Sequence, residues 1–161
     1  QCGAKLFKYH EDIEPYRGKE QEFHKKFIPY EVKEMGGNCL LNEGINNLWT
    51  LACGGTATAY NGTNARIGVG ESTATANGTQ TALQGTSTTY KAMEATYPTY
   101  GTSQLVTFKS SFGGTDANIA WNEWSIDNGS AASKNLNRKV EALGTKASGT
   151  TWTLEITVTI S

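Results

Sequence analysis

The clearest pattern in the sequence is a strict alternation of apolar and polar residues near the C-terminal end. The apolar positions are Trp152, Leu154, Ile156, Val158 and Ile160, and the positions between them hold threonines and one glutamate. Successive side chains of a strand point to opposite faces, so the pattern predicts an antiparallel strand over residues 151–160 with one face buried and one exposed. A shift of one residue would bury the threonines, which specifies the register.

Shorter apolar runs separated by turn signals predict further strands. We expect them over residues 65–69, 90–93, 105–112 and 119–126. The last of these runs carries Trp121 and Trp124 at positions of opposite parity. It is therefore expected to be a central strand with aromatic residues on both of its faces.

One clear helix is expected, over residues 42–53. Its apolar residues recur at i, i+3, i+4 and i+7, namely Ile45, Leu48, Trp49 and Ala52. Asn42 is the expected cap, and the two glycines at positions 54 and 55 end the helix. The apolar face is expected to lie against a sheet, with Trp49 in the core. A single helical turn is also expected over residues 79–83.

Several short strands with one short helix predict a mainly β fold, an antiparallel β-sandwich or jelly-roll-like domain. The composition changes near Gly36, so we expect residues 37–161 to form this domain and residues 1–36 to form a charged, extended arm. Residues 1–35 carry seven basic and seven acidic side chains. Neither the helical nor the strand period persists there, and only one helical turn is expected, around residues 19–26.

Widely spaced aromatic residues mark the arm and one loop of the domain as candidate interfaces. They are Phe7, Tyr9, Tyr16, Phe23, Phe27 and Tyr30 in the arm, and Tyr97 and Tyr100 in the loop. In one interpretation the arm packs back on the domain. In the other it docks on a neighbouring subunit and becomes ordered on binding. The sequence leaves both open.

The charge is balanced, with a formal net charge of -1. Without a sustained positive field, neither nucleic acid nor an anionic membrane is an expected partner. No apolar run approaches the roughly 20 residues that span a bilayer. The three cysteines, at positions 2, 39 and 53, match no zinc-binding spacing, so we expect reduced, packed thiols.

Candidate chemistry is sparse. The run His10-Glu11-Asp12 and the second histidine, His24, lie in the arm, and adjacent residues of this kind are expected to be solvated rather than to bind a metal. No nucleophile-elbow, zinc-protease or phosphate-loop motif is present. We therefore expect no metal or cofactor.

A glycosidase is the strongest enzymatic alternative. Glu123 lies between Trp121 and Trp124, and a second carboxylate would come from Glu71, Glu94 or Asp116. Such enzymes need two carboxyl groups on opposite sides of a sugar. Nothing in the spacing selects the second group, so we expect no catalytic residue and a protein that is not an enzyme.

Six sequence blocks, taken in order, resemble short structural proteins of tailed bacteriophages, including head-decoration (cement) proteins. The blocks are 38–49 (NCLLNEGINNLW), 66–72 (RIGVGES), 79–84 (TQTALQ), 91–98 (KAMEATYP), 117–124 (ANIAWNEW) and 136–140 (LNRKV). The resemblance covers residues 38–160 and leaves the charged arm outside. The order and spacing of the blocks carry it, since each block alone is unspecific.

The resemblance implies a virion structural protein that decorates the outer surface of a capsid and stabilises the shell. Its implied partners are the major capsid protein and further copies of itself, as a dimer or trimer, and its implied location is the capsid surface after synthesis in the host cytoplasm. A phage tail or fibre component that binds a host receptor or a tail partner is the first alternative. A carbohydrate-binding module is the second.

Overall fold

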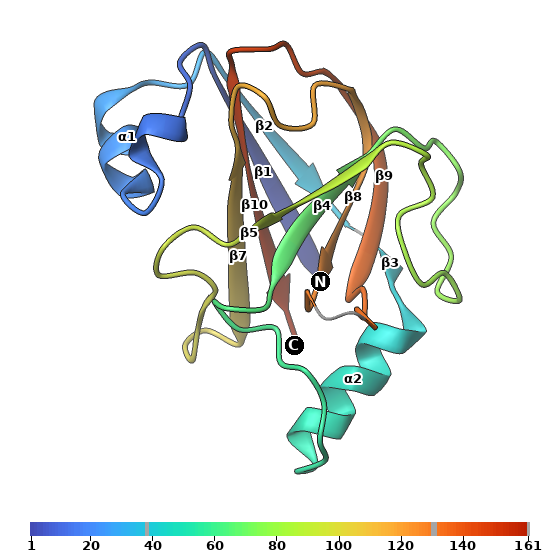
Figure 1. Ribbon diagram of the computed structural model, residues 1–161. Helices are drawn as coiled ribbons and strands as arrows, with labels where there is room; N and C mark the ends of the chain where they lie inside the picture. The colour runs from blue at the N-terminus through green and yellow to red at the C-terminus, as the bar shows by residue number, and fades with distance from the viewer. Residues whose placement is uncertain (38, 130–131, 161) are drawn as a thin grey trace.

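Two antiparallel five-stranded sheets packed face to face form the protein (Figure 1). The computed structural model describes residues 1–37, 39–129 and 132–160. The first sheet has the order β2 (Glu31–Gly36), β1 (Cys2–Tyr9), β10 (Thr151–Thr159), β7 (Leu105–Phe112) and β6 (Thr99–Tyr100). The second has the order β3 (Cys39–Leu40), β9 (Asn137–Thr145), β8 (Ala120–Asp127), β4 (Arg66–Gly70) and β5 (Thr88–Ala92). The predicted mainly β sandwich is confirmed.

The main core lies between the two sheets. In the first sheet Leu6 pairs with Leu154 and Ala4 with Ile156, and all four side chains are buried. Inward-facing residues of one sheet meet those of the other, as sandwich packing requires. The alternation that predicted β10 therefore identified Trp152, Leu154, Ile156 and Val158 correctly as its core face. The prediction is wrong for Ile160, which follows the strand and is 74% exposed.

Both tryptophans of β8 belong to this one core. Trp121 packs edge-on against Trp152 with ring centroids 5.0 Å apart, and Trp124 is equally buried. The pairing of β8 with β9 shifts register between Trp121 and Glu123. Strand β8 is central, as predicted, but its two tryptophans do not divide between a core face and an outer face.

Residues 1–36 are not an extended arm. Strand β1 lies between β2 and β10, pairs with both, and buries Leu6 completely. The expected boundary at residue 36 is therefore wrong, because the first two strands belong to the same sandwich as the rest of the chain. The sequence pattern concealed β1, since residues on both of its faces are covered and simple alternation of apolar with polar positions is lost.

A small second core covers the outer face of the first sheet. The short helices η1 (Glu14–Tyr16) and α1 (Glu20–Lys26) follow β1 and lie beside this sheet (Figure 1). Tyr9, Ile13 and Phe23 are buried there. Beneath this layer, Thr151 and Thr153 of β10 are fully buried. The prediction that all the threonines of β10 face solvent is therefore wrong for these two.

Helix α2 (Asn42–Ala52) projects from the opposite end of the sandwich (Figure 1). Leu41, not Asn42, occupies the cap position. Trp49 is 65% exposed, so the expectation that this helix packs flat against a sheet with its tryptophan in the core is wrong. Residues 79–83 form no helical turn. No helix in the described part of the chain is long and apolar enough to cross a membrane.

Candidate docking groove

The first turn of α2 fixes the helix to the sandwich. Glu43 accepts a hydrogen bond at 2.6 Å from the Asn135 amide, and the Leu41 amide donates to the Leu136 carbonyl at 3.0 Å. At Gly44 the helix backbone lies so close to the chain that a β-carbon would be 2.5 Å from Leu136 Cα. The attachment therefore depends on a glycine in the helix, where this residue normally costs stability.

Beyond this first turn, α2 forms one wall of an open groove of about 1240 Å³. Leu48, Leu51 and Ala52 line the helix side. The floor is the end of the main core, where Phe108 and Val158 lie. The groove is thus a space between α2 and the end of the sandwich that the two sheets leave open.

The opposite wall is the connection from β6 to β7. Tyr100 lines it and is 75% exposed, and the turn continues through residues 101–104. Ser103 and Gln104 adopt left-handed backbone conformations with φ of 54° and 55°. Two adjacent non-glycine residues in this region are uncommon, and such local strain is often found at binding sites.

The groove is apolar and uncharged. Among the described residues that line it, none carries a charge at neutral pH. Tyr60 donates from its hydroxyl to the Lys134 carbonyl at 3.0 Å, and burial raises the pKa of this phenol. Ile160 adds a further widely exposed apolar side chain, at 74%. A surface of this kind is typical of a contact with another macromolecule.

Most of the aromatic residues that the sequence suggested as an interface serve the protein's own interior. Tyr9 and Phe23 are buried in the second core, and Phe7, Tyr16 and Phe27 pack against it. The interpretation in which residues 1–36 dock on a neighbour is therefore corrected for Tyr9 and Phe23, which no partner can reach in the folded chain.

The remaining three candidates keep some exposure. Tyr30 is 48% exposed and stacks on His10 with centroids 4.2 Å apart. Tyr97 lies 5.5 Å from the ammonium of Lys109 and is partly buried. Only Tyr100 lies in the groove. Trp49 is a surface residue that the sequence pattern does not reveal, because its place on an amphipathic stripe indicates the core.

The first two carboxylates considered for a glycosidase lie on the outer side of the second sheet. Glu123 is fully buried and accepts a hydrogen bond at 2.7 Å from Nε of Arg138, itself fully buried. Glu71 accepts from the Thr86 hydroxyl at 2.6 Å. Glu123 also accepts a hydrogen bond at 2.7 Å from the Gly85 amide and so holds the segment between β4 and β5 against the sheet, whereas the Glu71 bond lies within that segment.

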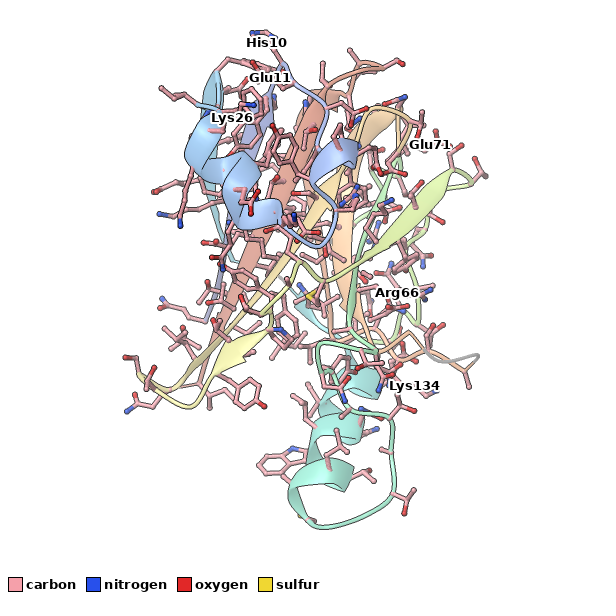
Figure 2. All side chains as sticks on the ribbon, turned by 60° about the vertical axis from the view of Figure 1, so that its left-hand side comes forward. His10, Glu11, Lys26, Arg66, Glu71 and Lys134 are labelled. Carbon is pink, nitrogen blue, oxygen red and sulfur yellow. The ribbon has the colours of Figure 1, made fainter. Side chains whose placement is uncertain are left out.

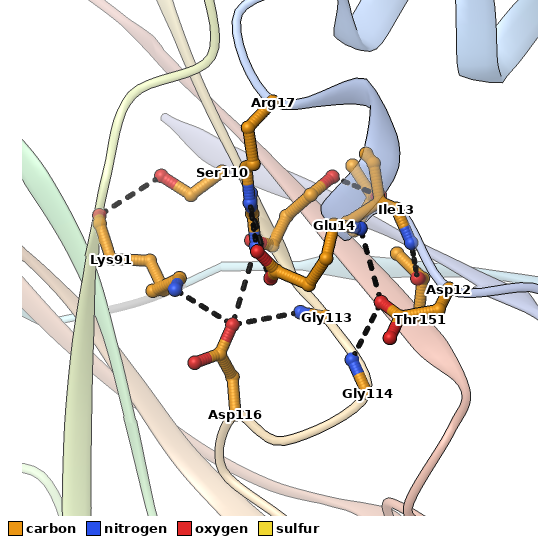
Figure 3. A network of polar contacts seen from close by, with 12 residues as sticks. Asp12, Ile13, Glu14, Arg17, Lys91, Ser110, Gly113, Gly114, Asp116 and Thr151 are labelled. Carbon is orange, nitrogen blue, oxygen red and sulfur yellow. Dashed lines mark hydrogen bonds and ion pairs between the residues drawn. The ribbon is translucent and has the colours of Figure 1, made fainter.

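The other two carboxylates bind residues 10–26 to the sandwich. Glu94 accepts hydrogen bonds from the Ser111 hydroxyl and, at 2.8 Å, from His24. Burial raises the pKa of Glu94, but these hydrogen bonds and the nearby charges outweigh it, so the pKa lies below its usual value. Asp116 contacts Lys91 at 2.7 Å and Arg17 at 3.2 Å (Figure 3). None of the four carboxylates lines the groove.

The other candidate ligands are also engaged locally. Asp12 accepts a hydrogen bond at 2.9 Å from the Gly114 amide (Figure 3). In the described part of the chain, no three histidine, cysteine, aspartate or glutamate side chains gather as a metal site would require. Cys53 is exposed, contrary to the expected packed thiol, and the side chain of Cys39 lies outside the described residues.

The groove between α2 and the β6–β7 connection is thus an apolar surface that no other described part of the chain fills. Comparisons with protein-family models, with curated proteins and with solved structures found no match for this chain.

Proposed function

We propose that this protein is a structural component of a phage virion, a decoration protein that binds the outer surface of a capsid and stabilises the shell. The observation that carries the proposal is the uncharged apolar groove at the α2 end, which the exposed Tyr100 lines, together with the exposed Trp49 on the helix that forms one wall. Trp and Tyr are the residues most enriched at the energetic centres of protein interfaces. The six sequence blocks that resemble phage structural proteins supply the virion context.

The chemistry of the groove favours protein as the class of partner. Phosphate backbones and anionic lipids are bound through clusters of lysine and arginine, and the groove has neither. Apolar surface with a polar rim and few charges is what stable protein contacts use. A small module repeated over a symmetric shell stabilises it collectively, because it binds the assembled state alone.

The test is to add the purified protein to shells that lack it. We expect it to co-sediment with the particles and to raise the temperature at which they release DNA. Tyr100→Glu, at a lining residue that is 75% exposed, should weaken both effects. Ile28→Glu adds the same charge at an apolar side chain that is 88% exposed and lies outside the lining, and it should not. Particles that gain no stability but adsorb better to cells would instead support the tail or fibre alternative.

A carbohydrate-binding module is the second candidate, because Trp49 and Tyr100 are exposed aromatic rings of the kind that stack on sugars. Sugar sites also need polar groups that hydrogen-bond hydroxyls. The groove offers a few, on Ser103 and Gln104. A glycan array distinguishes the two candidates: specific glycan binding that Tyr100→Ala abolishes would replace the capsid proposal.

A further inference from the structure

Lys146 holds an amine in the interior of the protein. It is 1% exposed, whereas lysines such as Lys26 and Lys134 lie at the surface (Figure 2). Nζ of Lys146 donates to the Gly113 carbonyl at 2.6 Å and to Oδ1 of Asn118 at 2.8 Å. The buried amine therefore lies directly against an amide side chain.

Both described hydrogen-bond partners of this amine are neutral. The other two buried cations that the structure describes, Lys8 and Arg138, each form an ion pair with a glutamate, Glu31 at 3.0 Å and Glu123 at 2.7 Å. A buried charge is costly unless an opposite charge pairs with it. A reaction that removes the charge of Lys146 would therefore stabilise its surroundings.

Two consecutive glycine carbonyls hold the amine and the amide in place. The Gly113 carbonyl accepts from Nζ of Lys146, and the Gly114 carbonyl accepts from Nδ2 of Asn118 at 3.0 Å. A β-carbon on Gly113 would overlap the carboxylate of Glu14, so the turn needs a glycine there to lie this close to the covering segment (Figure 3). The hydrogen bonds thus fix both the nitrogen that would attack and the nitrogen that would leave.

The separation of the two groups suits a reaction between them. Oδ1 of Asn118 is 2.8 Å from Nζ of Lys146. Because a C=O bond is about 1.2 Å long, the amide carbon lies within about 4 Å of Nζ. Reacting atoms held for attack are about 3 to 3.5 Å apart, so a small rotation of the amide brings the nitrogen onto the carbon.

We infer that Lys146 and Asn118 join in an isopeptide bond, a covalent cross-link between the β7–β8 connection and the residue that follows β9. The two residues are 28 positions apart in the sequence, so the fold itself brings the reacting groups together. The bond is a modification of the chain's own interior. It depends neither on the groove nor on the partner that the proposed function assigns to the groove.

The reaction exchanges one amide for another and needs no added reactant. The lone pair of the neutral Nζ attacks Cγ of Asn118, the Cγ–Nζ bond forms and the Cγ–Nδ2 bond breaks. The departing nitrogen takes the proton that Nζ gives up and leaves as ammonia, and no atom is oxidised or reduced. Asn118 is exposed, so the ammonia has a path to solvent. The new amide keeps one N–H, which can still donate to Gly113.

Burial also makes the amine more nucleophilic at neutral pH, because only the uncharged form attacks. It lowers the pKa of Lys146 from 10.5 to about 8, although the charge of Asp116 and of other carboxylates opposes the shift. About a tenth of the folded chains then hold a neutral Lys146 at pH 7, against fewer than about one in a thousand for an ordinary lysine. The rate of bond formation should rise about tenfold from pH 6 to pH 7 and level off above about pH 8.

Intact-mass spectrometry of the full chain tests the inference. Protein purified and kept at about pH 6 should retain the free amine, so the titration of Lys146 can be measured on fresh samples. After transfer to about pH 9, the mass should fall over days by that of one ammonia molecule. Trypsin should no longer cut after residue 146, and the digest should contain a branched peptide that joins Lys146 to Asn118. The melting temperature should rise, since a cross-link restricts the unfolded chain.

Lys146→Met and Asn118→Ala should each abolish the branched peptide and the gain in melting temperature. Asn118→Ala changes an exposed residue, so it tests the bond even where Lys146→Met folds poorly. Lys139→Arg is the matched control, because Nζ of Lys139 also donates to a glycine carbonyl, that of Gly36 at 2.9 Å. This variant should cross-link at the wild-type rate.

Other amides of the chain can also lose ammonia, above all the three Asn-Gly pairs that begin at Asn61, Asn77 and Asn128. A mass loss that persists in Lys146→Met, without a branched peptide, would therefore overturn the inference. An unchanged mass after weeks at about pH 9, with normal cleavage after Lys146, would overturn it as well. Shell binding is measured separately, so neither result bears on the proposed function.

Discussion

At the scale of single residues, the outer face of β10 shows how a covering layer changes the contribution of a side chain to the free energy of unfolding. Thr153 and Thr157 occupy equivalent positions of the same alternation, yet Thr153 is fully buried and Thr157 is not. The Thr153 hydroxyl bonds to Ser111, whose own hydroxyl donates to Glu94. Thr153 therefore donates to Ser111 at one end of a buried polar chain.

Thr153→Val should destabilise the protein by about 1–2 kcal/mol, because the shape is kept and a buried hydrogen bond is lost. Thr157→Val is the matched control. Its hydroxyl meets that of Thr107 at 3.2 Å in a partly exposed setting, and the expected change is within about 0.5 kcal/mol. Urea unfolding of both variants gives the comparison. Equal losses would mean that the second core does not seal this face.

Lys146 is a second residue whose surroundings set its energetics. Its ammonium is buried and donates to the Gly113 carbonyl at 2.6 Å and to Asn118 at 2.8 Å. Burial lowers the pKa of Lys146 from 10.5 to about 8, although nearby carboxylates oppose the shift. The folded state therefore loses this proton at a lower pH than the unfolded state does.

The lowered pKa of Lys146 predicts a pH dependence. Between pH 8 and pH 10.5 the unfolded chain holds a proton that the folded chain has lost, so this group makes the free energy of unfolding rise with pH there. The slope is at most about 1.4 kcal/mol per pH unit. Urea unfolding across this window should show a smaller rise, or a steeper fall, for Lys146→Met than for the wild type. Identical pH profiles would contradict the assignment.

At the scale of elements, α2 is attached through its first turn and through Asn47 and Leu48, and its second half is largely exposed. Its amphipathic stripe is real, since Leu48, Leu51 and Ala52 face the groove. Leu48 packs against the main core, but no internal surface covers Trp49, which is 65% exposed. The element is thus positioned by a close backbone contact at Gly44 and by Leu48, which packs against the main core.

Gly44→Ala should destabilise the protein by roughly 2 kcal/mol or more, although this change normally favours a helix by about 1 kcal/mol. The new β-carbon would lie 2.6 Å from the Asn135 carbonyl oxygen, a backbone atom that cannot move aside alone. Gly36→Ala is the control, because nothing lies within 4 Å of its β-carbon position. The melting temperatures of both variants are compared with that of the wild type. A stabilised Gly44→Ala variant would show that α2 is not held at this point.

At the scale of the whole molecule, the chain folds as one sandwich that needs its first residues. Strand β1 lies between β2 and β10, so removing residues 1–36 would remove two strands and expose β10 as an edge. The same cut would remove Tyr9, Ile13 and Phe23, the whole buried part of the second core. Losing both should lower the free energy of unfolding by more than any single core substitution would.

A chain that begins at residue 37 should therefore fail to fold cooperatively, as judged by circular dichroism and by the dispersion of its amide NMR signals. Adding the 1–36 peptide in trans is the control, and it should restore structure if the missing strands are the cause. Cooperative unfolding of the shortened chain on its own would mean that the remaining strands suffice, as the initial interpretation of a separable arm assumed.

The sequence by itself determined the elements in which one period dominates, namely β10, β7 and the range of α2 to within a residue. It also determined the mainly β class and, from an apolar run, the place of β8. Local sterics and the burial of one face impose those periods, so they are visible in the chain. Strand β1 escaped detection, because its two faces are covered by different cores and the alternation disappears.

Only the tertiary structure decided what covers each apolar or polar face. Periodicity indicates that Trp49 shares a face with other apolar residues. It does not indicate whether a sheet or solvent covers that face. The same holds for Thr153 and for Glu123, whose burial depends on segments far away in the sequence. Contacts of this kind depend on which distant segments the fold brings together. The groove is an example, because its walls are α2 and a hairpin far away in the sequence.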